Sequence, residues 1–131
     1  EESVARINLA LAKPMPIREA VAGFVGEMIE RIVAGPGRAG CFIGNCAAEL
    51  AGHDRATIAR VRQSLARIEG AFCDALTRAQ ARGEIAAAAD VASLARFLVS
   101  GIQGLRLVGK ANPDRAALTD IAAIMLRCLD P

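Results

Sequence analysis

Apolar residues recur every three or four positions along most of this chain, which is the spacing of amphipathic helices. The frequent Ala residues favour helix as well, and β-branched residues never alternate with polar ones over a useful stretch. We therefore predict an all-α helical bundle of about six helices, separated by short Gly- and Pro-containing joints. The predicted helices span residues 3–12, 17–34, 41–51, 54–82, 90–109 and 112–129.

Several predicted helix boundaries carry residue types that favour the start or the end of a helix. Asp54, Asp90 and Asn112 are predicted N-caps, since their side chains can accept hydrogen bonds from free backbone N–H groups. Pro113 would then occupy the first position of the last helix. Gly83 is the predicted stop of the fourth helix.

The width of each apolar face predicts what the helix contacts. Helix 54–82 has one stripe about 100° wide, whereas the last two helices have arcs of about 200°. An arc this wide indicates that each helix packs against two surfaces, its own domain and a second subunit. The predicted interface residues are Leu94, Phe97, Leu98, Gly101, Gly104, Leu105, Val108, Leu118, Ile121, Ile124, Met125 and Cys128.

Helix 41–51 is apolar on nearly all sides, which is typical of a helix in the middle of a domain. Bulky apolar side chains around it, with small Ala and Gly residues between them, predict a pocket for a small apolar or amphipathic ligand. Asn45 and Glu49 are candidates for orienting that ligand, or they satisfy buried backbone groups or an Arg instead. The candidate pocket residues are Phe24, Met28, Phe42, Asn45, Cys46, Glu49, Leu65, Phe72, Ile102 and Gln103.

The charge pattern argues against nucleic-acid binding by these residues alone. The net charge is +2, and the Arg residues are interleaved with acidic ones or lie on a solvated helix face. No uninterrupted apolar run reaches the roughly 18 residues of a membrane span, and no secretory signal is present. We expect a cytoplasmic protein without a membrane partner, in which the four Cys are unpaired.

The sequence does not predict a catalytic or metal site, or a cofactor. The single His, His53, adjoins a helix break, and nothing in the sequence holds it against a nucleophile. Cys41 and Cys46 have neither redox nor zinc-knuckle spacing. A metal site would require the fold to bring these residues together with Cys73.

Two segments resemble the C-terminal effector domain of TetR-family transcriptional regulators. Residues 40–50, Gly-Cys-Phe-Ile-Gly-Asn-Cys-Ala-Ala-Glu-Leu, are similar to the buried central helix of that family, and residues 95–106 to its penultimate helix with a Gln-Gly-Leu core. The resemblance implies a homodimer in which the last two helices of each subunit form an intermolecular four-helix dimer bundle. It also implies a ligand-responsive repressor, in which a small molecule bound in the helical core releases DNA.

The N-terminal helix-turn-helix head of the family has no counterpart in residues 1–131, and the chain opens Glu-Glu-Ser without Met. We therefore expect residues 1–12 to be the tail of a linking helix, and duplex DNA to bind only through a missing N-terminal domain. Two alternatives stay open at this point. One is a small cysteine-dependent redox enzyme, and the other is a helical interaction module without a ligand.

Overall fold

The computed structural model describes residues 2–35 and 54–131 of the chain, and every regular element in them is helical. The predicted helix 41–51 lies outside the described residues. The all-α class is confirmed, and five of the predicted helices are present within a few residues of the expected bounds. They are α1 (Glu2–Leu11), α2 (Ile17–Ala34), α4 (Arg55–Ala81), α5 (Val91–Ala111) and α6 (Arg115–Leu126), followed by a 3₁₀ turn η2 (Arg127–Leu129).

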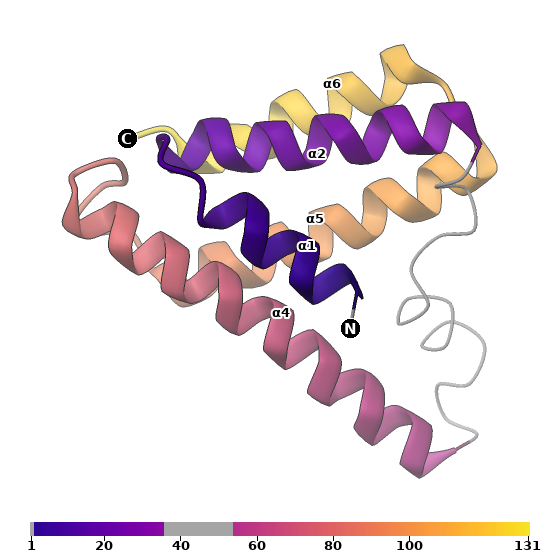
Figure 1. Cartoon of the computed structure of the whole chain (residues 1–131), viewed down its shortest axis with the longest axis horizontal. Helices are drawn as coiled ribbons and strands as arrows, with labels where there is room; N and C mark the ends of the chain where they lie inside the picture. Colours follow the sequence, from indigo (N-terminus) through magenta and orange to yellow (C-terminus); the bar gives the residue numbers. More distant parts are fainter. Residues whose placement is uncertain (1, 36–53) are drawn as a thin grey trace.

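The helices form a bundle in which α2 and α6 lie side by side and antiparallel (Figure 1). Ion pairs join their two ends: Arg18 Nε lies 2.9 Å from Asp130 Oδ1, and Arg115 donates two hydrogen bonds of 2.8 and 2.9 Å to Glu30. Helix α4 packs chiefly on α5 and α1, and α1 lies between α2 and α4. Every helix therefore contributes a face to one shared interior.

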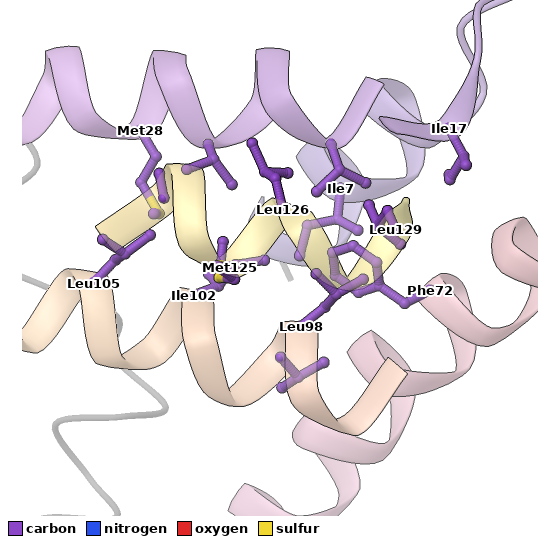
Figure 2. Close-up of a cluster of buried hydrophobic side chains, with 14 of the residues drawn as sticks. Ile7, Ile17, Met28, Phe72, Leu98, Ile102, Leu105, Met125, Leu126 and Leu129 are labelled. Atoms are coloured by element: carbon purple, nitrogen blue, oxygen red, sulfur yellow. The ribbon is translucent and has the colours of Figure 1, made fainter. Parts of the chain in front are cut away.

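The interior is apolar throughout the described residues, with no buried polar or charged side chain among them. Phe72 on α4 and Leu98 on α5 are buried near its centre, and α6 adds Met125 and Leu126 between α2 and α5 (Figure 2). Burial of such side chains stabilises each by about 1.5–3 kcal/mol relative to exposure. The apolar helix faces predicted from the sequence pack against one another in this core.

The predicted caps of α4 and α5 are confirmed. Asp54 accepts a 3.0 Å hydrogen bond from the N–H of Ala56, and Asp90 accepts a 3.2 Å bond from the N–H of Ser93. Gly83 follows α4 with a φ of 78°, a left-handed conformation that glycine adopts without a steric penalty. The Gly83 N–H bonds to the carbonyl of Gln80, which satisfies one of the last helical acceptors.

The predicted start of the last helix is wrong. Asn112 does not cap α6, because it is the C-cap of α5 and its N–H bonds to the Val108 carbonyl at 2.7 Å. The N-cap is Asp114, whose carboxylate accepts from the Ala116 N–H at 3.1 Å. Helix α5 also continues past Gly109 to Ala111, since Gly109 is packed inside the bundle rather than at a helix end.

Two polar side chains that the sequence analysis did not single out fix the joints between helices. The Gln80 amide donates to the carbonyls of Ala86 and Ala89, both at 3.0 Å, and so holds the α4–α5 connection against α4. Glu84, from the same connection, accepts a 2.7 Å hydrogen bond from the N–H of Ile17, the first residue of α2. The N-terminus of α2 has no side-chain cap from Pro16, so a distant residue supplies the acceptor.

Candidate functional site

A pocket of about 340 Å³ lies between α1, α2 and α5. Apolar side chains from the first two helices, among them Leu9, Phe24 and Met28, form part of its wall. In Figure 2, Met28 points from α2 toward α5, close to Leu105. The size falls within the range of small-molecule sites, which span about 300–1,000 Å³.

The rest of the pocket wall is charged and predominantly basic. Arg6 and Lys13 come from α1 and the turn that follows it, Arg31 from α2 and Arg106 from α5, and Glu27 is the only carboxylate among the described lining residues. Arg106 is half-buried, and its Nε donates to the Met28 sulfur at 3.2 Å. The pocket lining therefore combines apolar side chains with an excess of basic ones.

The structure brings only part of the predicted ligand set to this pocket. Phe24 and Met28 line it. Phe72 and Ile102 belong to the filled core instead, and Leu65 packs against that core half-buried. Gln103 is half-buried on α5 and does not line the pocket. The remaining candidates, Phe42, Asn45, Cys46 and Glu49, lie outside the described residues.

The basic residues of the pocket were missed from the sequence because they are far apart along the chain. Lys13 belongs to the joint after α1, and Arg106 lies on α5, more than ninety positions later. Only the crossing of α1, α2 and α5 brings them to one place. One signal in the sequence was the position of Arg106 beside the apolar residues Ile102 and Leu105 of the same helix.

Among the described cysteines, Cys73 and Cys128 are free and half-buried. Burial and the nearby Asp130 carboxylate raise the pKa of the Cys128 thiol, which makes its reactive thiolate rarer near neutral pH. No group of three or more potential metal ligands occurs within residues 2–35 and 54–131. Cys41, Cys46 and His53 lie outside the described residues, so this finding does not extend to them.

A second candidate surface is the outward side of α5 and α6. Large apolar side chains are exposed there, with Leu107 at 69 % and Ile124 at 65 % of their full accessibility. On α5, Phe97, Gly104 and Val108 follow one another at helical spacing on this side. The exposed large apolar residues of this surface, which we call the α5–α6 face, are Phe97, Leu107, Val108, Ile121 and Ile124.

The predicted interface residues divide between this face and the core. Leu98, Leu105, Leu118 and Met125 are buried within the single chain, while Leu94 and Cys128 pack against the core half-buried. Phe97, Gly104, Val108, Ile121 and Ile124 are exposed on the outside. Gly101 is half-buried, and a Cβ atom built there would lie 2.3 Å from the Met125 sulfur. The lack of a side chain at Gly101 thus serves the α5–α6 contact inside one chain.

Helix α5 is also long and apolar enough, by length and composition, to cross a membrane. It reaches this hydropathy on average, although Arg96 and Arg106 interrupt its apolar residues, so it contains no uninterrupted apolar run of that length. A single such helix is weak evidence for a span, because core helices of soluble proteins have the same composition. One side of α5, including Leu98, Ile102 and Leu105, packs into the core of this bundle.

The fold is an all-helical bundle, a class in which ligand sites form between facing helices. Residues 19–125 match the family described as tetracyclin repressor-like, C-terminal domain. This match covers most of the chain, which therefore belongs to the family of TetR C-terminal domains. No curated protein and no solved structure matches the chain. Domains of this family are generally dimeric and regulate DNA binding.

Proposed function

We propose that this chain is the effector-binding and dimerisation domain of a ligand-responsive transcriptional repressor. The observation that carries the proposal is the family match over residues 19–125. Two features of the bundle agree with it: a pocket between α1, α2 and α5, and an uncovered apolar face on α5 and α6. In this proposal the domain binds a small effector molecule and pairs with a second copy of itself, and it performs no catalysis.

The pocket between α1, α2 and α5 is the proposed effector site. Helix α1 forms one wall, so a ligand that fits between α1 and α2 would set the distance between these helices. In the intact protein, we expect α1 to continue toward the DNA-binding domain. A change in its position would then alter the spacing of the two DNA-binding heads and release DNA.

The α5–α6 face is the proposed dimer surface. Contiguous exposed apolar patches are uncommon on soluble monomers and usually mark interaction sites. In a two-fold dimer, α5 and α6 of one copy would pack on the same helices of the other and cover Phe97, Ile121 and Ile124. Such an interface should bury more than about 1,200 Å² in total.

The intact repressor would act in the cytoplasm and contact duplex DNA through an N-terminal domain. A fusion experiment tests the proposal as a whole. The chain is joined to a heterologous DNA-binding head that represses a reporter gene only as a dimer. We expect repression by the wild-type fusion, and loss of repression with Ile124→Glu, because the charge would be buried in the interface.

Met15→Glu is the matched control, because Met15 is an exposed apolar residue in the joint between α1 and α2, away from the α5–α6 face. It should repress like the wild type. Fusion protein that accumulates normally but never represses would contradict the proposed dimerisation.

A further inference from the structure

The basic side chains that line the pocket indicate the chemical class of the effector. We propose that this pocket accepts an amphipathic carboxylate, with the apolar body against Leu9, Phe24 and Met28 and the carboxylate against Lys13, Arg31 and Arg106. The inference rests on the effector-binding function proposed above, and it adds the charge of the ligand. Planar guanidinium groups bind carboxylates through paired, charge-assisted hydrogen bonds.

Arg106 is the residue that argues most directly for an anion. It lies on α5, half-buried, and its Nε donates to the Met28 thioether sulfur at 3.2 Å. A thioether is a weak acceptor and carries no charge, so it compensates a partly desolvated guanidinium poorly. A ligand carboxylate in the pocket would supply the missing negative charge and accept from the remaining N–H groups.

Lys13 and Arg31, which line the pocket with Arg106, also lack an ion-pair partner among the described residues. Lys13, Arg31 and Arg106 make no ion pair within residues 2–35 and 54–131. Among the described lining residues, Glu27 is the only carboxylate, against these three cations. The excess of positive charge favours an anionic ligand over a neutral or cationic one of the same shape.

Two arginines elsewhere in the bundle pair with a carboxylate on a neighbouring helix. Arg96 on α5 pairs with Glu69 on α4 at 3.2 Å, and Arg115 on α6 pairs with Glu30 on α2. The pocket differs from these contacts because, within residues 2–35 and 54–131, Lys13, Arg31 and Arg106 have no carboxylate at ion-pair distance. Cations without a carboxylate partner among the described residues are available to bind the carboxylate of a ligand.

The apolar part of the pocket limits the ligand to an amphipathic molecule. Leu9 on α1 is 72 % exposed, and Phe24 on α2 is half-buried. A hydrocarbon chain would cover Leu9 and Phe24 and remove their surface from water. An inorganic anion alone would leave this surface exposed.

The test uses three eight-carbon probes of equal length and different charge: octanoate, octanamide and octylamine. The chain contains no Trp and no Tyr, so Phe24→Trp places a single fluorescent reporter in the pocket wall. Binding is measured by the emission of that variant and by the Tm of the unaltered chain. We expect octanoate to shift both signals, and to bind at least about tenfold more tightly than octanamide and octylamine.

Charge variants then test which residues hold the carboxylate. Arg106→Met and Arg31→Gln should each weaken octanoate binding about tenfold or more, and leave octanamide binding unchanged. Lys110→Met is the matched control, since Lys110 is a cation on the same helix as Arg106 and does not line the pocket. It should bind octanoate like the wild type. Circular dichroism confirms that each variant is folded.

The outcomes separate this inference from the function on which it rests. Equal binding of octanoate and octanamide, unaffected by Arg106→Met, would overturn the anionic specificity and leave an effector pocket of apolar character. Failure of all three probes to change either the emission or the Tm would count against the pocket as an effector site. Loss of octanoate binding in Lys110→Met as well as Arg106→Met would overturn the assigned contacts, because it would indicate a general charge effect.

Discussion

Gly109 lies where α5 crosses α2, and the two helices approach closely there because it has no side chain. A Cβ atom at this position would lie 2.7 Å from Ile32 Cγ2 and 3.2 Å from Ile32 Cδ1. Ile32 is buried and β-branched, so its χ1 has little freedom to move aside. Gly109 therefore keeps the spacing of the bundle near the end of α5.

We predict that Gly109→Ala lowers the free energy of unfolding by about 1–3 kcal/mol, because the added methyl group overpacks the contact with Ile32. The control is Gly70→Ala on α4, where a Cβ atom would meet nothing within 4 Å. That change should stabilise the chain by about 0.5–1 kcal/mol through helix propensity alone. Urea unfolding measures both, and equal effects of the two changes would contradict the packing argument.

Sequence patterns at single residues predicted local features well and distant contacts poorly. Asp54 and Asp90 cap their helices as expected, since a cap depends on residues two or three positions away. The prediction that Asn112 caps the last helix was wrong. Asp114, two positions later, can also act as an N-cap, and the sequence does not show which of the two the helix uses. The bond from Ile17 to Glu84 joins residues far apart in sequence, and no periodicity indicates it.

Helix ends are held by contacts between elements as much as by their own caps. Glu84 joins the end of α4 to the start of α2, through the Ile17 N–H and an ion pair with Arg82. The hydrogen bond from Arg82, followed by that from Ile17, lowers the pKa of the Glu84 carboxyl below its ordinary value. The ionised carboxylate is the form that both partners stabilise.

This lowered pKa predicts a pH-dependent contribution to stability. The contribution is fully present above the ordinary pKa of glutamate, and it is lost as the pH falls through the lower pKa of the folded state. Wild type should therefore have a higher Tm than Glu84→Gln at neutral pH, and the difference should shrink in acid. Asp74→Asn, which removes an exposed carboxylate on α4, is the control. A difference between wild type and Glu84→Gln that stayed constant from neutral to acidic pH would contradict the assignment.

The wide apolar arcs of the last two helices predicted two contacts for each helix but could not separate the two sets of residues. Leu98 and Phe97 are adjacent in sequence, yet Leu98 is buried and Phe97 is 49 % exposed. The division depends on how α5 is rotated against α4 and α6, which is a property of the packed bundle. The structure assigns the inner residues and leaves Phe97, Ile121 and Ile124 to the α5–α6 face.

At the scale of the whole molecule, the position of the pocket also depends on how the helices pack, which the sequence pattern does not show. The sequence predicted an apolar site in the core, and Phe24 and Met28 do line a pocket. Phe72 and Ile102 instead fill the interior, because complementary helix faces pack together without leaving space there. The charged part of the pocket arises only where α1, α2 and α5 meet.

The central claim is that two copies of this domain pair through the α5–α6 face, and sedimentation equilibrium tests it most directly. At micromolar concentration the wild-type chain should have twice its 13.7 kDa mass. Ile124→Glu should sediment as a folded 13.7 kDa monomer, since Ile124 is 65 % exposed and its substitution leaves the core intact. Met15→Glu should remain dimeric. A wild-type chain that sediments as a well-folded monomer, or a dimer that Ile124→Glu leaves unchanged, would contradict the account.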